Sequence, residues 1–235
     1  MSEALEDQQR PPVRHLEEQQ RRVLGVLLEK AFTTPDAYPL TIKAIATGSS
    51  QKSNRDPVQD YSEDEVSDAL HELQELGLIA EVHTDGGRTA RYRHLVRKRY
   101  AFSEPQLAIL TELWLRGRQQ MGELRTRASR MVNIESQEVL RDALQPLLAD
   151  GYVQANGPLE RRGVEVDHGF YPDGEYRAAW SAAGEESSPR SASSGSTSAP
   201  ASALQNRCSE LEQRVDELES RLSDVEDKLA RLAGG

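Results

Sequence analysis

The sequence predicts a mainly α-helical fold with small β-hairpins, an α+β arrangement in which one structural unit occurs twice. Three observations lead to this prediction. A stretch of about 20 residues repeats within the chain, Ser and Gly residues stand at the expected ends of helices, and the last 30 residues or so carry a heptad pattern. The first two observations define the body of the protein and the third defines its tail.

The repeat aligns residues 62–81 with residues 136–155 at one offset and without gaps. Ser62 falls on Ser136, Gly77 falls on Gly151, and the apolar residues between them recur at helical spacing. Each copy therefore predicts a helix that begins after an N-cap Ser, ends at a Gly and leads into a short strand. In the first copy Glu65 stands three residues after Ser62 and predicts a capping box.

The segments around each copy of the repeat also correspond. We expect a first helix over 16–32 and again after Ser103, and a short middle helix over 41–47 and over 122–131. In the first of these helices one apolar face is formed by Leu16, Val23, Leu24, Leu27 and Leu28. After each Gly we expect two strands joined by a turn, over 78–82 with 88–96 and over 152–155 with 164–172.

Three helices followed by a hairpin, present twice, are typical of tandem winged-helix domains. A three-helix bundle without a hairpin is the alternative. The boundaries that we expect are a disordered leader over 1–14, winged-helix domains over 15–100 and 101–180, a Ser/Ala-rich linker over 181–203 and a coiled coil over 204–232.

The composition narrows the class of protein. The net charge of the 235-residue chain is −10, so any nucleic-acid binding has to rest on a local basic patch. With a single cysteine, one chain forms no disulfide and no thiolate zinc site. No apolar run is long enough to span a membrane, and the N-terminus has no signal-peptide core. We expect a cytoplasmic protein.

Three motifs give the chain a family resemblance. They are TTPDAYPL at 33–40, QKSNRDPV at 51–58 and RGxxxxGELRxRAxRM at 116–131. On these motifs the region 16–180 resembles the YceH family, a bacterial group of uncharacterised function. The resemblance implies two winged-helix domains and cytoplasmic residence, and it implies no established activity.

The charge distribution argues against DNA binding through a recognition helix. In winged-helix proteins that bind DNA the third helix enters the major groove, but here the third helix of the first copy carries six carboxylates and no Lys or Arg. Positive charge gathers instead on the expected first hairpin and just after it, at Arg88, Arg91, Arg93, Arg97 and Lys98. These cations either contact phosphate groups or pair with the acidic helix beside them, and the sequence leaves both open.

The loop that begins near Ser50 adds two further candidates. Lys52 and Arg55 can present cations to a phosphate or to an acidic partner, or the loop can serve as a hydrogen-bonded connector that sets the angle between helices. In the second middle helix Arg125, Arg127 and Arg130 flank an apolar stripe, and we expect them to pack against neighbouring carboxylates.

No signature of an enzyme is present. The sequence has no Gly-rich phosphate loop, no HExxH motif and no nucleophile elbow, so we expect a non-enzymatic protein without a cofactor or metal. Two functions remain open. The first is a regulatory or nucleic-acid-associated factor that contacts double-stranded DNA through the basic hairpin, and the second is a protein-interaction scaffold that uses the acidic third helices.

The tail predicts a coiled coil of about four heptads. Position a is occupied by Cys208, Val215, Leu222 and Leu229, and position d by Leu204, Leu211, Leu218, Val225 and Leu232. Every g position is basic and every e position is acidic, from Arg207 and Glu212 onward. Parallel identical chains place these opposite charges together, so we expect a parallel homodimer, with a trimer as the other oligomer that the pattern permits. The alternative is a lone amphipathic helix that folds back on the body.

Overall fold

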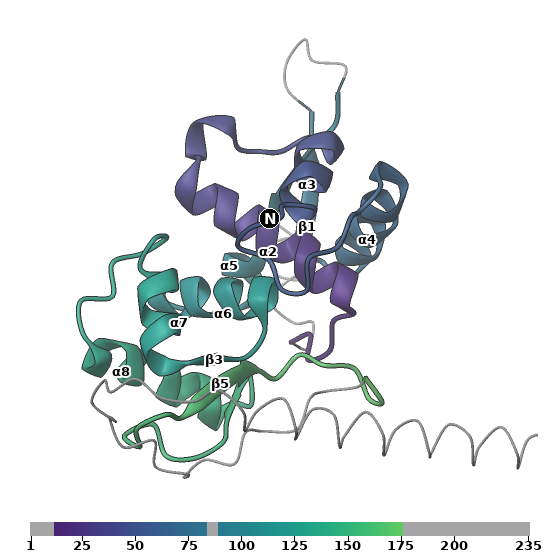
Figure 1. Cartoon of the computed structure of the whole chain (residues 1–235). Helices are drawn as coiled ribbons and strands as arrows, with labels where there is room; N and C mark the ends of the chain where they lie inside the picture. The colour runs from purple at the N-terminus through teal and green to yellow at the C-terminus, as the bar shows by residue number, and fades with distance from the viewer. Residues whose placement is uncertain (1–11, 84–88, 176–235) are drawn as a thin grey trace, which may run out of the picture. The chain divides into compact units, whose positions relative to one another are not determined.

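The computed structural model describes residues 12–83 and 89–175 (Figure 1). Within these residues the fold is mixed, with seven α-helices, one short 3₁₀ helix and two small antiparallel sheets. None of the described helices is long and apolar enough to cross a membrane. The linker and coiled-coil predictions and most of the leader prediction lie outside the described residues.

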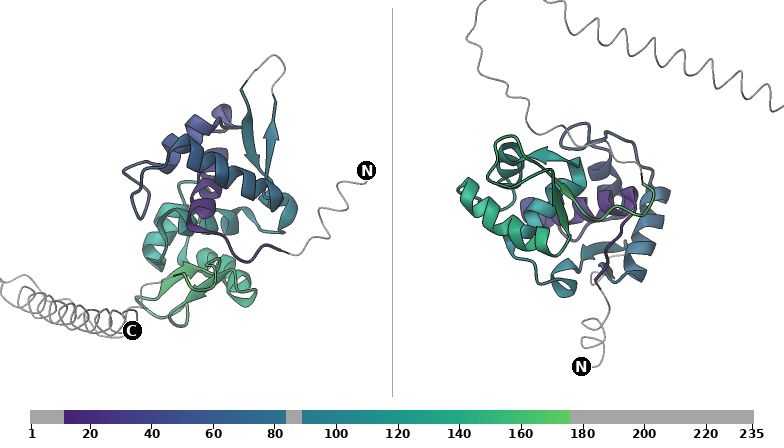
Figure 2. Two further views of the ribbon diagram at one scale, coloured as in Figure 1. Left: turned by 90° about the vertical axis from the view of Figure 1, so that its right-hand side faces the viewer. Right: turned by 90° about the horizontal axis from the view of Figure 1, so that it is seen from below.

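The first copy of the unit contains three principal helices and a pair of strands. In chain order its elements are α2 (Glu18–Thr33), η1 (Pro35–Ala37), α3 (Ile42–Ser49), α4 (Glu63–Glu75), β1 (Ile79–Val82), β2 (Arg91–His94) and α5 (Val96–Arg99). Strands β1 and β2 pair antiparallel from Ile79 opposite His94 to Val82 opposite Arg91. They extend beyond the helices of this copy (Figure 2).

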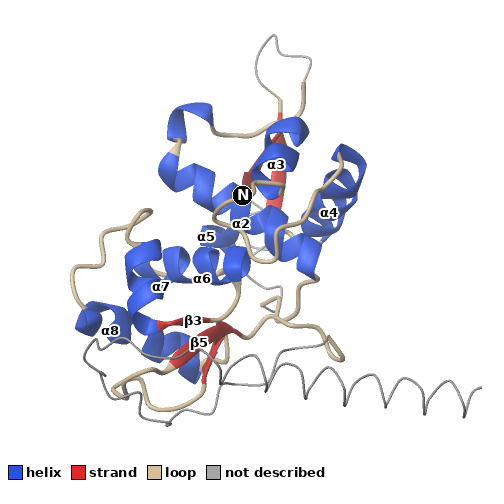
Figure 3. Cartoon of the chain, in the orientation of Figure 1, coloured by secondary structure: helices blue, strands red, loops and turns tan. Residues whose placement is uncertain are grey.

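The second copy repeats this order. Its elements are α6 (Glu104–Arg116), β3 (Gln119–Gln120), α7 (Met121–Ala128), α8 (Gln137–Ala149), β4 (Val153–Ala155) and β5 (Glu165–His168). The three strands form an antiparallel sheet in the order β3-β5-β4 (Figure 3). The first copy has a shorter counterpart of β3, an isolated bridge between Leu40 and Tyr92, which also precedes the middle helix.

The helix ends confirm the predicted boundary signals. The Ser62 and Ser136 hydroxyls accept hydrogen bonds from the third backbone N–H of α4 and α8, and the capping box of Ser62 with Glu65 is present. Gly77 and Gly151, each two residues before the start of a strand, adopt left-handed φ angles of 69° and 74°, a conformation that glycine adopts without the steric cost of a side chain. The two copies therefore use the same local signals to begin and end their third helices.

The two copies differ from prediction in three details. The middle helices begin and end at other residues than expected, since α3 spans Ile42–Ser49 and α7 spans Met121–Ala128. The expected strand over 88–96 ends at His94, and the basic segment after it forms the short helix α5. Strand β3 was not predicted, because a two-residue strand has no alternating pattern of its own and exists through its partners on β5.

The first helices of the two copies form the centre of the core. All residues from Gln20 to Leu28 on α2 and from Leu107 to Leu115 on α6 are buried, so the prediction of one apolar face on the first helix was too narrow. The reason is that α2 packs on α6 as well as on α3 and α4. A Cβ atom on Gly25 would lie 2.9 Å from Leu115 Cδ2, so the absence of a side chain permits the close approach.

The end of the expected leader also packs on the body. The Tyr100 hydroxyl donates a hydrogen bond of 2.8 Å to the Val13 carbonyl, and Arg14 donates one of 2.6 Å to the Asp150 carbonyl. The Arg14 guanidinium lies 4.2 Å above the centre of the Tyr152 ring. Residues 13 and 14 thus bridge the two copies of the unit.

Candidate functional site

Strand β2 carries two residues of the predicted basic surface of the hairpin, Arg91 and Arg93. Tyr92 is only 9% exposed and faces the core, while its neighbour Arg93 is exposed. Arg91 is half-buried and donates a hydrogen bond of 2.8 Å to the Pro39 carbonyl. The alternation along β2 therefore turns Arg91 and Arg93 away from the core, and of the two Arg93 is exposed while Arg91 is partly engaged by the backbone. Arg88 lies outside the described residues.

The carboxylates of α4 are not bound to these arginines. Within residues 12–83 and 89–175, no hydrogen bond or ion pair shorter than 4 Å joins a carboxylate of α4 to Arg91 or Arg93. Within α4, His71 Nε2 lies 3.5 Å from Glu75 Oε1, and both side chains are exposed. Glu72 accepts a hydrogen bond from Gln20 at 2.9 Å. Among the described residues, the carboxylates of α4 therefore do not pair with the arginines of β2.

The remaining cations of this region stand on α5. Arg97 pairs with Glu104 at 3.0 Å, and its guanidinium lies 5.6 Å from the centre of the Phe32 ring. Lys98 is exposed. Because the segment is helical, Arg97 and Lys98 do not continue the face of the strand on which Arg93 lies.

Burial removes Arg55 from the predicted contact surface. Its side chain is 0% exposed and binds the Glu29 carboxylate at 2.6 Å, and it also donates hydrogen bonds to the carbonyls of Gly48 and Asn54 at 2.9 and 2.7 Å. A guanidinium in this position cannot reach an external phosphate, so the structural reading of the loop is correct for Arg55. Lys52, in the same loop, is exposed.

The loop that contains Arg55 binds the second copy of the unit. The Asp56 backbone N–H donates a hydrogen bond of 3.0 Å to the carbonyl of Leu115, near the end of α6. The Asn54 side-chain oxygen accepts hydrogen bonds from Arg116 and, at 3.2 Å, from Arg130. The segments QKSNRDPV and RGxxxxGELRxRAxRM, far apart in the sequence, therefore meet in space.

The arginines of α7 and the turn after it bind neutral oxygens more than carboxylates. Arg125 donates to the Ile134 carbonyl at 3.1 Å, and Arg127 donates to the Gln119 side-chain oxygen at 2.7 Å. The carboxylate partner of Arg127 is Glu123, at a longer distance of 3.7 Å. The expectation that these arginines pack against neighbouring carboxylates was wrong for Arg125, since backbone carbonyls just before α8 take that role.

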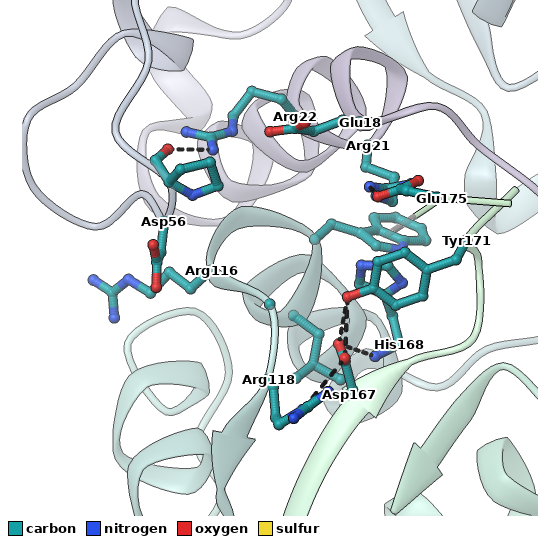
Figure 4. Close-up of a pocket in the computed structure, with 14 residues that line it drawn as sticks. Glu18, Arg21, Arg22, Asp56, Arg116, Arg118, Asp167, His168, Tyr171 and Glu175 are labelled. Atoms are coloured by element: carbon teal, nitrogen blue, oxygen red, sulfur yellow. Dashed lines mark hydrogen bonds and ion pairs between the residues drawn. The ribbon is translucent and has the colours of Figure 1, made fainter. Parts of the chain in front are cut away.

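A cavity of about 390 Å³ lies where α2, the loop after α3, the end of α6 and the segment after β5 meet (Figure 4). Its lining includes four arginines, namely Arg21, Arg22, Arg116 and Arg118, and four carboxylates, namely Glu18, Asp56, Asp167 and Glu175. None of these side chains was a predicted site residue.

One side of the cavity is organised around the buried Asp167 carboxylate. It accepts hydrogen bonds from the Tyr171 hydroxyl at 3.0 and 3.1 Å and from the His168 backbone N–H at 2.8 Å, and Arg118 Nε lies 3.8 Å from it. The His168 and Tyr171 rings stack with their centres 4.0 Å apart. Burial, and then the Asp167 charge, raise the pKa of Tyr171, so the phenol keeps the proton that it donates.

The opposite side of the cavity is formed by two arginines of α2. Arg21 binds the Glu175 carboxylate through both terminal nitrogens, at 2.9 and 2.5 Å. Arg22 is 2% exposed and donates hydrogen bonds to the carbonyls of Ser49 and Pro57 at 3.3 and 2.7 Å. Burial lowers the pKa of the Arg22 guanidinium.

The cavity therefore joins residues of both copies through groups that largely bind one another. Among the described residues no group of three or more His, Cys, Asp and Glu side chains could hold a metal ion. The one sequence signal that could have indicated the cavity is the position of Arg21 and Arg22 within the apolar part of the first helix, where long charged side chains need buried partners.

These observations define the class as a protein of mixed α and β structure in which two related helical units share one core. The chain belongs to the family described as "Protein of unknown function, DUF480", which it matches over residues 16–162. It is 44% identical over 151 residues to a UPF0502 protein of Rhodopirellula baltica, covering 64% of this chain and 63% of that protein. It is 53% identical over 110 residues to a UPF0502 protein of Geobacter sulfurreducens, covering 47% of this chain and 50% of that protein. The matches thus span about half to two thirds of the relatives' length, and the relatives carry no assigned activity in their names.

Proposed function

We propose that the protein is a non-enzymatic, cytoplasmic factor of two winged-helix units that contacts the DNA backbone through the hairpin of the first unit. The exposed Arg93 on β2, without a carboxylate partner among the described residues, is the observation that carries the proposal. Arg91, on the same strand, adds part of its charge, and the exposed Lys98 follows on α5.

The order and pairing of the elements support the winged-helix assignment. In each copy a short extended segment between the first and middle helices pairs with the last strand, Leu40 with Tyr92 and Gln119 with Val166. A helix, a short strand, two more helices and a two-stranded hairpin are the elements of a winged-helix unit. The hairpin of β1 and β2 then corresponds to the wing.

The charge distribution supports a backbone contact made without the third helix. Glu63, Asp64 and Asp68 are exposed on α4 and would face phosphate groups if α4 entered a groove. A cationic strand contacts phosphates without reading bases, so we expect weak sequence preference and affinity that falls steeply with salt.

The same exposed carboxylates favour a second function. A protein partner with a basic surface could bind α4, in which case the protein is an interaction scaffold that does not bind DNA. The exposed, unpaired state of Glu63 and Asp64 within the described residues is the observation behind this alternative.

A fluorescence anisotropy titration with a labelled duplex at two salt concentrations separates the two functions. The wild type is compared with Arg93→Glu, with Arg91→Glu/Arg93→Glu, and with Arg141→Glu as a matched control on α8. The DNA proposal predicts salt-dependent binding that both hairpin variants lose and the control keeps, with the salt slope reduced by about 1 for each phosphate contact removed. Absence of wild-type binding at low salt would reject it in favour of the scaffold. Thermal unfolding checks that each variant is folded.

We also propose that residues 204–232 dimerise the chain as a parallel coiled coil. Support comes from the heptad pattern and from the opposite charges at positions g and e. A dimer would present two hairpins to one duplex and raise the effective affinity of a weak contact.

A further inference from the structure

We propose that the arginines around Asn54 form a binding site for the phosphate group of a small phosphorylated compound, separate from the hairpin. This inference does not depend on the proposed DNA contact. The site consists of Arg116, Arg127 and Arg130 from the end of α6 and the region of α7, together with Asn54 from the loop after α3.

The charges of this cluster are not balanced by its own partners. Arg116 pairs with the buried Glu112 at 2.9 Å. The carboxylate nearest to Arg127 is that of Glu123, at 3.7 Å, and the Glu123 side chain is 56% exposed. The hydrogen bonds of Arg130 within the described residues go to the Asn54 side chain and to the Arg127 carbonyl. Three guanidinium groups therefore share one close carboxylate, and that carboxylate is itself buried, which raises the pKa of Glu112.

The arginines of the cluster converge on a neutral oxygen, although their charges favour an anion as partner. The Asn54 Oδ1 atom accepts hydrogen bonds from two guanidinium groups, Arg116 and Arg130. Hydrogen bonds from arginine to an anionic oxygen are about twice as strong as those to a neutral one, and guanidinium groups match the geometry of phosphate. Asn54 also has a φ of 62°, the one left-handed backbone conformation of a non-glycine residue among the described residues. Such conformations concentrate at functional sites.

The cavity beside the cluster suits the rest of a small ligand. Arg116 belongs to both the cluster and the cavity lining, and in Figure 4 its side chain runs past Asp56, away from Asp167 and Tyr171. A volume of about 390 Å³ lies within the range of small-molecule pockets. The exposed carboxylates of Glu18 and Asp56 line the same cavity, and they can accept hydrogen bonds from hydroxyl groups. The ligand class that fits is therefore a hydroxylated phosphate monoester, such as a sugar phosphate.

Tryptophan fluorescence tests the proposal on the full chain. Trp114 lines the cavity, and a Trp180→Phe background leaves it as the single tryptophan of the two in the sequence. Inorganic phosphate and ribose 5-phosphate serve as probes, with chloride at equal ionic strength and ribose as controls. We expect a saturable change with both phosphates, tighter for ribose 5-phosphate, and none with the controls. Absence of a saturable response to either phosphate would overturn the inference.

Two substitutions locate the response. Arg130→Gln removes an exposed member of the cluster and should weaken phosphate binding about tenfold, whereas Arg141→Gln on α8 should leave it unchanged. Asn54→Asp places a carboxylate against Arg116 and Arg130, where it competes with the ligand's anion, so it should raise the thermal midpoint and abolish the phosphate response. A fully retained response in both Arg130→Gln and Asn54→Asp would place the phosphate elsewhere and refute the site. If instead Arg130→Gln weakens duplex DNA binding while ribose 5-phosphate has no effect on fluorescence, the phosphate belongs to nucleic acid and the small-ligand proposal fails.

Discussion

Replacement of Arg55 by methionine tests the structural role of the loop after α3. The substitution keeps an unbranched side chain but removes the guanidinium that binds Glu29 and the carbonyls of Gly48 and Asn54. Removal of one partner of a buried ion pair costs about 3–5 kcal/mol, because the other charge stays buried and unpaired. The Glu29 side chain is 17% exposed and keeps some access to water, so we expect the lower end, about 3 kcal/mol.

Urea unfolding at neutral pH measures the change in the free energy of unfolding. Lys52→Met is the matched control, because Lys52 is exposed in the same loop and should change stability by less than about 0.5 kcal/mol. The double variant Arg55→Met/Glu29→Gln removes the unpaired charge and should regain about 1 kcal/mol or more of the loss. If Arg55→Met costs no more than Lys52→Met, the buried ion pair does not hold the loop and the reasoning is wrong.

Three further predictions concern stability and assembly. Burial, and then the nearby Arg97 cation, lower the pKa of His94 from 6.5 to about 4. Between these two pH values the unfolded chain therefore binds a proton at His94 that the folded chain does not. The free energy of unfolding should fall by about 2 kcal/mol as the pH drops from 6.5 to 4. Urea unfolding across this range should show less of that loss for His94→Gln and an unchanged loss for the exposed His71→Gln. Gly25→Ala should lower stability by about 1 kcal/mol in spite of the helix preference of alanine, because its Cβ would lie 2.9 Å from Leu115 Cδ2. Gly122→Ala is the control and should not lower stability, because the one atom within 4 Å of its Cβ is Gln137 Nε2, at 3.9 Å. Oxidation should convert the chain to a covalent dimer through Cys208 on non-reducing gels, and a purely monomeric mass in sedimentation at micromolar concentration would end the coiled-coil proposal.

The sequence predicted the elements of the fold where the signal is local. The caps at Ser62 and Ser136 and the stops at Gly77 and Gly151 depend on a few neighbouring residues, so they can be read from the chain and the structure confirms them. Strand β3 and the full burial of α2 depend on partners far away in the sequence. No local pattern carries that information.

The candidate sites were less predictable for a similar reason. Arg55 and Arg93 are both cations in predicted connecting or hairpin segments, yet Arg55 is enclosed by Glu29 and two backbone carbonyls and Arg93 faces solvent. The convergence of Asn54 with Arg116 and Arg130 follows from the packing of one copy on the other. Residue type alone distinguishes none of these environments, because it is the tertiary partner that decides whether an arginine is structural or accessible.

Hydrogen–deuterium exchange of the full chain, with and without a duplex at low salt, tests the proposed DNA contact most directly. We expect the duplex to slow exchange in peptides that cover β1 and β2 and to leave α4 unchanged. Slower exchange on α4, or no duplex-dependent change on the hairpin, would contradict the account.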